Sequence, residues 1–585
     1  MKKLLLIIPM HITFESFLNP AHNSRNFKKK DGKVYNSLST DLPLGAMSIS
    51  AYLKKHIDID VQLIDFNAEI NALDAFPFEN FYDCCISYLE NITTKPDFIG
   101  ISSLFSPSFY NFIDCGKAAK KIFPNSLVIG GGNIPTNSYA SIYESARSDV
   151  IQGGIYYDGL CFGEGEKPML ELLKSQNPIE YMNESASWIT YNKLHNNPEP
   201  LMPKHNFIEN LDEIPFLDYD LCDLKKHSSN QVVSSSYGVG DKLGFHLMTS
   251  RGCPYFCTFC ASHRTHGRKM RYYSIDRVRA DLIKLKDKYN AGTIIFQDDH
   301  LMSDKQRVYS ILEIVKDLGV ISLYQNGLTL YALDREMLQA FYDAGVRHLT
   351  LPVESGSEKV LKEQMKKPLK LRISERVARD CRELGIYTNS FVMIGMPGET
   401  KEDLEQGRLN LRNVPTNWFN VACASPIVGS DMHNLARQKK YIKLETLGSD
   451  FRTAIIETED FSAEYIQDYQ YRMNLELNFV LNQDIKFGEY KLALKAFKNV
   501  IRMREDHAFA YYYSALCFKG LGQFEDEKIY FDLYLKFSDS IFWKKWIEFF
   551  QLPTSYNDFN QLTTLPPSVN FLYSSSERFV ELDTQ

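Results

Sequence analysis

The sequence predicts an α/β protein in three parts: an N-terminal domain built on a parallel sheet, a full or partial α/β barrel, and an α-helical C-terminal region. Three observations predict this order. Apolar runs alternate with amphipathic segments over residues 1–175, six more strand–helix units follow over residues 245–424, and strand signals end near residue 445. Apolar strands that alternate with helices imply parallel sheets covered on both faces.

The composition fits a large globular protein. The chain has 585 residues, enough for three or four domains. Hydrophobic residues make up 44% and charged residues 24%, which excludes disorder over most of the chain. The net charge of −7 gives no bulk attraction to nucleic acid or to an anionic membrane, so neither is an expected partner.

The N-terminus and the cysteines indicate the compartment. No apolar run reaches the ~18 residues that cross a bilayer. The start of the chain meets Pro9 and His11 without a small-residue cleavage site, so it fits a buried first strand better than a signal peptide. We therefore expect a cytoplasmic protein, in which the eleven cysteines are free thiols or metal ligands rather than disulfides.

In the N-terminal part, helices are expected at 45–55, 109–123 and 138–146, between strands at 4–8, 61–64, 98–102, 127–130 and 150–152. Parallel sheets bind ligands at the carboxyl ends of their strands. Two glycine clusters occupy such positions: Gly130-Gly131-Gly132 directly follows a strand, and Gly163-Glu164-Gly165-Glu166 precedes a helical stretch at 168–174.

A segment rich in Asn, Pro and Ser follows, which we expect to be an extended linker around residues 211–216. The second block has expected helices at 275–289, 304–318, 334–344 and 374–384, and expected strands at 245–249, 293–297, 321–325, 348–352, 390–394 and 420–424. Six strand–helix units close naturally as a full or partial α/β barrel.

The C-terminal region contains an internal repeat. Gly488-x-Tyr490 recurs as Gly522-x-Phe524, and Phe497 recurs as Phe531, each at a spacing of 34 residues. That period is the tetratricopeptide length. An ordinary helical hairpin is the alternative, and we expect the Ser/Thr-rich last residues of the chain to be loosely ordered.

The strongest signal is a group of three cysteines, Cys253, Cys257 and Cys260, directly after the first barrel strand. Thiolates are soft ligands that suit an iron–sulfur cluster or zinc. A structural zinc site usually has four protein ligands, and here only His263 or His266 could complete one. Three thiols without a metal are the remaining alternative.

The spacing C-x-x-x-C-x-x-C resembles that of the radical S-adenosylmethionine (SAM) enzymes. The resemblance implies that the three thiolates hold a 4Fe–4S cluster whose fourth iron binds SAM, and that a 5′-deoxyadenosyl radical abstracts hydrogen from a substrate. It implies a SAM contact at Phe259, the aromatic residue between the last two thiols. It implies further contacts at family motifs that end barrel strands: Asp298, Glu354, Ser355, Gly395 and Gly398. Taken alone, each of these strand-end positions could instead be a turn or a helix cap.

The N-terminal domain is similar to the cobalamin-binding domains that precede many radical SAM barrels. The resemblance rests on segments such as Pro96–Ser103, Ile129–Gly132 and Phe162–Glu166, and it implies cobalamin contacts at Ser102, Ser103, Gly130, Gly131, Gly132, Asn133, Gly163 and Glu164. The domain has no D-x-H-x-x-G motif, so we expect no histidine below the cobalt. A doubly wound domain without a ligand, or with another nucleotide, is the alternative.

These resemblances imply a Rossmann-like cobalamin-binding domain at 1–200, a linker at 201–240, a partial (β/α)6 TIM-type barrel at 241–445, a tetratricopeptide-like helical domain at 446–555 and a tail at 556–585. The implied cofactors are a 4Fe–4S cluster, SAM and cobalamin. The sequence does not identify catalytic side chains of its own.

The commonest activity among such relatives is methylation of an unactivated carbon through a 5′-deoxyadenosyl radical and methylcobalamin. The implied partners are a small-molecule or peptide substrate, an electron donor such as flavodoxin or ferredoxin, and a protein partner on the helical tail. The first alternative is ring rearrangement, cyclisation or oxidation without methyl transfer. The second is a non-catalytic adaptor that uses the tail.

Overall fold

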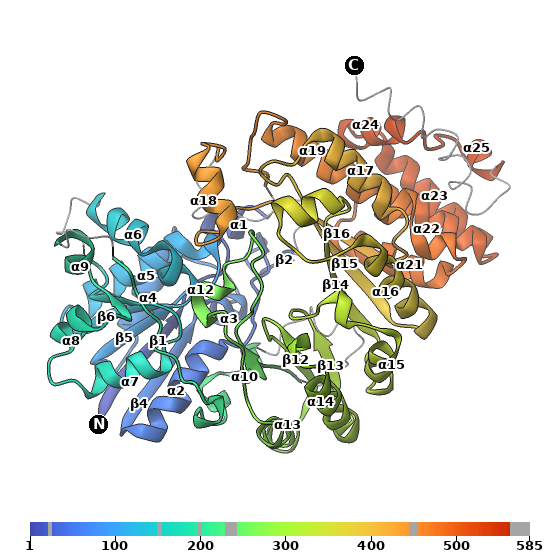
Figure 1. Ribbon diagram of the computed structural model, residues 1–585. Helices are drawn as coiled ribbons and strands as arrows, with labels where there is room; N and C mark the ends of the chain where they lie inside the picture. The colour runs from blue at the N-terminus through green and yellow to red at the C-terminus, as the bar shows by residue number, and fades with distance from the viewer. Residues whose placement is uncertain (21–25, 149–154, 197–200, 228–242, 444–452, 562–585) are drawn as a thin grey trace.

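The computed structural model describes residues 1–20, 26–148, 155–196, 201–227, 243–443 and 453–561. Figure 1 shows three parts in chain order: a sheet with its helices in blue to teal, a second set of strands and helices in green to yellow, and a group of helices in orange to red. The α/β fold class with a helical C-terminal region, expected from the sequence, is confirmed.

The N-terminal sheet has the strand order β4-β1-β5-β6-β7-β8 in the described part of the chain. Its strands are β1 (Lys2–Ile8), β4 (Ile59–Asp65), β5 (Phe98–Ser102), β6 (Leu127–Gly131), β7 (Gly159–Cys161) and β8 (Trp188–Ile189). All pairs are parallel except β7 with β8. The strands expected from the sequence match β1, β4, β5 and β6. The one expected at 150–152 lies outside the described residues, and β7 was not expected.

Helices cover both faces of this sheet. Leu4 and Leu6 of β1 belong to one buried cluster, which also includes residues of α2 (Leu44–His56) and α7 (Glu166–Lys174). Leu5 and Ile7 belong to another, with residues of α4 (Phe81–Glu90) and α5 (Phe109–Ile122). Side chains of a strand point alternately to its two faces, so this division explains why the strand is apolar throughout rather than alternating.

The segment before the barrel is packed rather than extended. Leu211, Ile214 and Tyr219 are fully buried, and the Tyr219 hydroxyl donates to the carbonyl of His246 at 2.8 Å. Short helical turns at η2 (Leu211–Glu213) and η3 (Tyr219–Leu221) replace the extended linker expected here. The reason is the apolar side chains, which bury surface against the first barrel strand.

The second block contains β9 (Leu243–Leu247), β12 (Ala291–Phe296), β13 (Ile321–Tyr324), β14 (His348–Glu354), β15 (Tyr387–Ile394) and β16 (Trp418–Cys423). In the described residues these strands form two parallel sheets, β13-β12-β9 and β14-β15-β16, and β13 lies against β14. All six expected strands are therefore present. The arrangement is consistent with a partial barrel, with α13 (Ile275–Tyr289), α14 (Lys305–Leu318), α15 (Arg335–Asp343), α16 (Leu371–Leu384) and α17 (Lys401–Leu411) between the strands.

The edge of β16 is covered by the C-terminal helices. The Asn478 side chain accepts from the backbone N–H of Phe419 at 2.7 Å and donates to its carbonyl at 2.8 Å. Gln470 of α19 (Ala463–Leu475) donates to the carbonyl of Val421 at 2.6 Å. These amides satisfy edge groups that would otherwise be open for pairing with another chain, so the helical region acts as a cap on the barrel.

The remaining helices pack as antiparallel neighbours: α21 (Tyr490–Met503), α22 (Ala508–Gly520), α23 (Phe524–Ser538) and α24 (Ile541–Phe549). α21 and α23 begin 34 residues apart, and Gly488 and Gly522 before them share a left-handed backbone, with φ of 74° and 72°. This agrees with a repeat of helical hairpins, and the tetratricopeptide assignment remains a prediction. Of the tail expected to be loosely ordered, residues 556–560 form α25 (Tyr556–Asn560), and the part after residue 561 lies outside the described residues.

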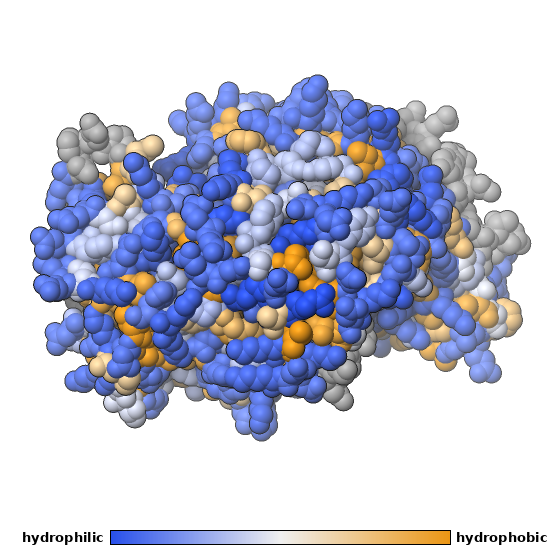
Figure 2. All heavy atoms as spheres, turned by 60° about the horizontal axis from the view of Figure 1, so that its bottom comes forward, coloured by the Kyte–Doolittle hydropathy of each residue, from blue (hydrophilic) through white to orange (hydrophobic). Residues whose placement is uncertain are grey.

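The face drawn in Figure 2, the lower side of the molecule turned forward, is mostly hydrophilic, with smaller hydrophobic groups near its middle and toward its left and right. In the described ranges, none of the helices combines the length and the apolar character needed to span a bilayer.

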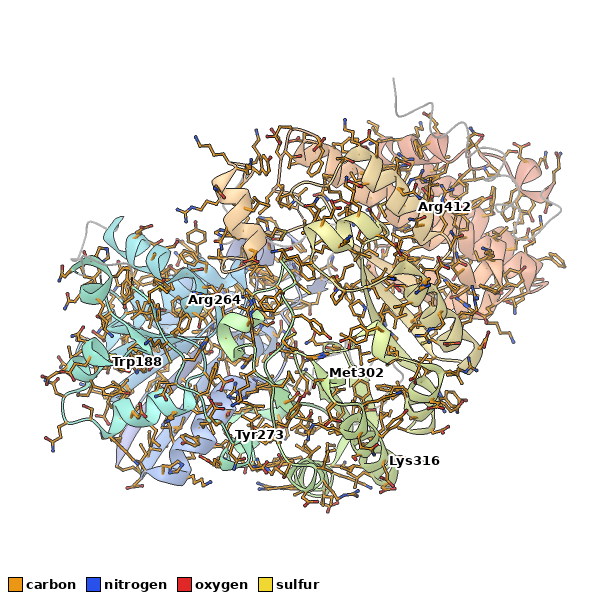
Figure 3. All side chains as sticks on the ribbon, viewed as in Figure 1. Trp188, Arg264, Tyr273, Met302, Lys316 and Arg412 are labelled. Atoms are coloured by element: carbon orange, nitrogen blue, oxygen red, sulfur yellow. The ribbon has the colours of Figure 1, made fainter. Side chains whose placement is uncertain are left out.

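A buried ion cluster ties the cap to the barrel. Glu476 accepts from Arg408 at 2.7 Å and lies 2.6 Å from Arg412. Arg412 is labelled in Figure 3, where the barrel meets the helical region. Arg408 is 2% exposed and Glu476 is 3% exposed. Because removing one partner of a buried pair leaves an uncompensated charge, Glu476 should be essential to this contact.

We expect Glu476→Gln to lower the free energy of unfolding by about 3 kcal/mol, because two guanidinium groups lose their carboxylate. Urea denaturation followed by circular dichroism measures this. The exposed Glu505→Gln is the control and should change stability by less than about 0.5 kcal/mol. An equally small effect of Glu476→Gln would contradict the structural role.

Candidate functional site: the cysteine loop and the interdomain cavity

The three cysteines lie on one loop, residues 252–270, which we call the cysteine loop. It leaves β10 (Ser250–Arg251) and returns through β11 (Arg271–Tyr272), and the two strands pair antiparallel. Gly252 starts it with φ of 97°, and a Cβ there would lie 2.4 Å from the carbonyl of Lys269. Only glycine fits this turn, so the loop closes tightly at its base.

The three thiols are half-buried and near one another, whereas the other eight cysteines are all buried. Burial raises the pKa of Cys253 to about 12, and the charge of Cys260 adds to this rise. Burial also raises the pKa of Cys257 to about 11, and the ammonium group of Lys367 opposes it. Neighbouring thiolates repel one another, and a shared metal centre offsets this repulsion and keeps the sulfurs in the thiolate form.

The donor set fits an iron–sulfur cluster better than one metal ion. Nowhere in the described part of the chain do three His, Cys, Asp or Glu side chains come close enough to hold a single ion. Among these residues, neither His263 nor His266 joins the thiols in such a group, and Nδ1 of His266 lies 2.8 Å from a carboxylate oxygen of Glu164. Three half-buried thiols on a short loop can instead reach three corners of a larger cluster.

The loop is fixed on both sides. Thr258 donates its N–H to the carbonyl of Met365 at 3.1 Å and its hydroxyl to that of Gln364 at 2.6 Å. Its own carbonyl accepts from the N–H of Met432 at 2.8 Å, at the start of α18 (Asp431–Gln438). Phe259 is half-buried and packs against the same cluster of buried residues that contains Leu4 and Leu6, and its contact with SAM stays a prediction.

Two expected SAM contacts end β14. Glu354 has φ of 66°, a left-handed conformation that is uncommon for a residue other than glycine, at a register shift of the strand. Its carboxylate pairs with Lys367 at 2.8 Å, which brings an ammonium group to the cysteines. Ser355 is buried, and its hydroxyl accepts from the N–H of Ser357 at 3.1 Å, so this side chain supports the turn.

The expected glycines Gly395 and Gly398 are both left-handed, with φ of 83° and 86°. A Cβ at Gly395 would lie 2.9 Å from Ile466, and one at Gly398 would lie 2.9 Å from Gln364. Glu399 follows them, is buried, and accepts from the N–H groups of Gly395 and Met396 at 2.7 and 3.0 Å. The loop is therefore shaped by its own carboxyl group and by the packing of α19.

Asp298, an expected SAM contact, is fully buried and faces the protein. It accepts from the N–H and hydroxyl of Thr249 and from the hydroxyl of Ser250, at 2.6–3.1 Å. It thus holds the strand that leads into the cysteine loop. Its neighbour Asp299 instead lines the interdomain cavity and lies near Cys253, whose pKa is raised first by burial and further by this charge. The sequence, which offers both carboxylates, does not distinguish the two.

A cavity of about 340 Å³ lies between the N-terminal sheet and the barrel, on the side of β9 and β12. Its walls come from the carboxyl ends of β1, β5 and β6, from the loop after β7 and from the barrel mouth, including Met248 and Gln297. Figure 3 labels Tyr273, which lines it, and Arg264 on the neighbouring α12 (Ser262–His266). Most of the expected cobalamin contacts belong to the wall: Ser102, Gly130, Gly131, Gly132, Gly163 and Glu164.

The glycines leave room for a ligand or for close packing. A Cβ at Gly131 would meet no atom within 4 Å, so this position is open toward the cavity. Gly132 has φ of 95°, and a Cβ there would lie 2.6 Å from the carbonyl of Ser103. Ser103 itself is buried and bonds to Ser108, and Asn133 accepts from Thr265. These last two expected contacts are therefore used within the protein.

His11 is a cavity residue that sequence reasoning missed. It follows β1 by three residues, is 9% exposed, and packs edge-on against Phe105 at 5.2 Å. Burial lowers its pKa, and its Nδ1 has no hydrogen-bond partner among the described residues. A neutral imidazole thus stands on the cavity wall although the chain lacks the histidine motif. The only available signal was its place directly after a predicted strand.

Comparison with known families agrees with this geometry. Residues 38–173 match the B12 binding domain, and residues 247–406 match the radical SAM superfamily. The chain is therefore a radical SAM enzyme that carries a B12 binding domain, and its cofactors are a 4Fe–4S cluster, SAM and cobalamin.

Individual relatives are distant. The chain is 29% identical to the cytidylyl-2-hydroxyethylphosphonate methyltransferase of Streptomyces wedmorensis, over 67% of this chain and 77% of that one. Its fold resembles that of the radical SAM methyltransferase TsrM from Kitasatospora setae, with a TM-score of 0.54 and 14% identity over 76% and 78% of the two chains. It also resembles the cobalamin-dependent SAM radical enzyme OxsB, with a TM-score of 0.57 and 14% identity over 99% and 84%.

We expect Ala at Cys253, Cys257 or Cys260 to abolish the brown iron–sulfur absorbance after anaerobic reconstitution, because each removes a ligand. Iron and sulfide analysis measures the loss. Cys381→Ala, at a thiol that is fully buried in α16, should keep a full cluster and is the control. A full cluster in any of the three variants would contradict the assignment.

A pH effect should come from Glu399, whose pKa burial raises to about 7. The folded protein keeps this proton between about pH 4.5 and 7, where the unfolded chain has lost it, so the free energy of unfolding falls as pH rises through that window. Glu399→Gln cannot ionise and should remove this part of the slope. Denaturation of the cofactor-free protein at pH values across the window measures it, and equal slopes in both proteins would contradict the expectation.

Proposed function

We propose that this chain is a cobalamin-dependent radical SAM methyltransferase that acts on an unactivated carbon. One observation carries the proposal: the cavity is lined both by the strand ends of the B12 binding domain and by residues in or near the cysteine loop, such as His266 and Asp299. Reacting groups held in one cavity gain the large advantage of proximity. When bound, the cofactors supply a hydrogen-abstracting radical and a transferable methyl group.

The residues of the chain hold and orient these groups. We assign cobalamin contacts to Ser102, Gly130–Gly132 and Gly163, because these residues line the cavity wall. Among these glycines, Gly131 is the one whose missing side chain leaves open space. We assign SAM contacts to the rim around the cysteines, at Phe259, Glu354 and the backbone at Gly395 and Gly398. Asp299 replaces Asp298 in this assignment, because Asp298 is occupied within the protein.

The partners follow from the same proposal. The substrate is a small molecule or a peptide, and the reducing electron comes from a donor such as flavodoxin or ferredoxin. The helical cap is the candidate surface for a protein partner. All eleven cysteines are free, which fits a reducing compartment such as the cytoplasm.

Isotope labelling tests the reaction. We expect the reconstituted enzyme, given SAM with a trideuterated methyl group, reductant and cytidylyl-2-hydroxyethylphosphonate as the first probe, to form S-adenosylhomocysteine and 5′-deoxyadenosine in parallel. A methylated product would gain three deuterium atoms, which mass spectrometry detects. The Cys257→Ala variant is the control and should form no 5′-deoxyadenosine.

The products also separate the alternatives. Rearrangement, cyclisation or oxidation without methyl transfer gives 5′-deoxyadenosine without S-adenosylhomocysteine. A non-catalytic adaptor gives neither. If S-adenosylhomocysteine never appears in cobalamin-loaded enzyme, the methyltransferase proposal fails.

A further inference from the structure

The base of the cysteine loop is a pair of buried arginines. Arg251 is the last residue before Gly252, and Arg271 is the first residue after the loop; they face each other in the β10–β11 pair. They are 6% and 3% exposed. Because these residues close the loop at both ends, whatever fixes them also fixes where Cys253 lies.

One carboxylate of the other domain holds both arginines. Oε2 of Glu164 lies 3.0 Å from Nη1 of Arg251 and accepts from Nη1 of Arg271 at 2.9 Å. Oε1 accepts from Nη2 of Arg271 at 2.5 Å and lies 2.8 Å from Nδ1 of His266. Burial disfavours the charge on Glu164, but these cations outweigh it and lower the pKa of the carboxyl group.

Glu164 belongs to the loop 163–166 on the cavity wall, which we call the cavity loop. Glu166 of the same loop accepts from Nη2 of Arg251 at 2.7 Å and from the hydroxyl of Ser48 at 2.5 Å. A Cβ at Gly163 would lie 3.2 Å from the carbonyl of Thr265 in the cysteine loop. The wall of the cobalamin cavity and the base of the cysteine loop are therefore in direct contact.

We propose that Glu164 is a positioning residue that couples the two cofactor sites, so that a bound cluster strengthens cobalamin binding and bound cobalamin stabilises the cluster. A ligand that holds the cavity loop in place also acts on Glu164 and, through it, on both arginines. A cluster that holds the cysteine loop acts in turn on Glu164 and the cavity loop, because a coupling free energy acts equally on both ligands. The inference rests on the two cofactors and not on methyl transfer.

The test measures binding without substrate or reductant. Hydroxocobalamin is titrated anaerobically into cluster-free and cluster-loaded protein, and the ratio of the two Kd values is the readout. In the wild-type protein we expect hydroxocobalamin to bind the cluster-loaded form at least about 5-fold more tightly than the cluster-free form. Glu164→Gln should bring this ratio to about one while the absorbance of the loaded cluster stays unchanged. If Glu164 had a merely structural role, its substitution would raise both Kd values and leave their ratio unchanged.

Glu171→Gln is the matched control. This residue lies on α7, the helix that follows Glu164, and its carboxylate accepts from Tyr181 and Asn206, outside the cysteine loop. It should keep the wild-type ratio. Glu166→Gln removes the charge of a carboxylate that contacts Arg251 through one nitrogen and not Arg271. It should give an intermediate ratio, so the test does not depend on one variant.

A second readout is iron release to a chelator, which cobalamin should slow in the wild-type protein and not in Glu164→Gln. A wild-type Kd ratio of one overturns the proposal whatever the variants do. So does a Glu164→Gln protein that keeps the wild-type ratio. Failure of methyl transfer leaves these binding measurements unaffected.

Discussion

The contact on which the site depends is a carboxylate from one domain buried between two guanidinium groups of the other. Removing ions from water costs several kcal/mol for each, and the cost is recovered only when opposite charges and hydrogen bonds meet in good geometry. Glu164 meets that condition with Arg251, Arg271 and His266 at once. A cluster of this kind tolerates few arrangements, so it fixes the cavity loop against the cysteine loop.

Many polar residues around the site serve its loops and not its ligands. Asp298 holds the strand before the cysteine loop, Glu399 holds the turn after β15, and Asn133 bonds to Thr265. Each satisfies groups that would otherwise be buried without partners. The cofactor contacts that we propose therefore lie at glycine backbone and at a few half-buried side chains, which agrees with cofactors that perform the chemistry while the protein positions them.

The helical C-terminal region completes the barrel. Asn478 and Gln470 take the place of a further strand along β16, and Glu476 joins the cap to α17 through Arg408. A partial barrel leaves an open edge, and covering it prevents pairing with other chains. These helices therefore form the wall of the barrel beside β16.

The sequence by itself determined the order of elements and predicted the cluster ligands, because apolar periodicity and cysteine spacing are local properties. All six barrel strands and the strands β1, β4, β5 and β6 follow from it. Only the tertiary structure decided that Asp299 and not Asp298 faces the cavity, that residues 211–219 pack instead of forming a linker, and that His11 joins the cavity wall. The same holds for Glu164, which the sequence offered as a cofactor contact and the fold placed on two arginines. Which way a side chain points depends on the register and packing of strands far apart in the chain, and no local pattern contains that information.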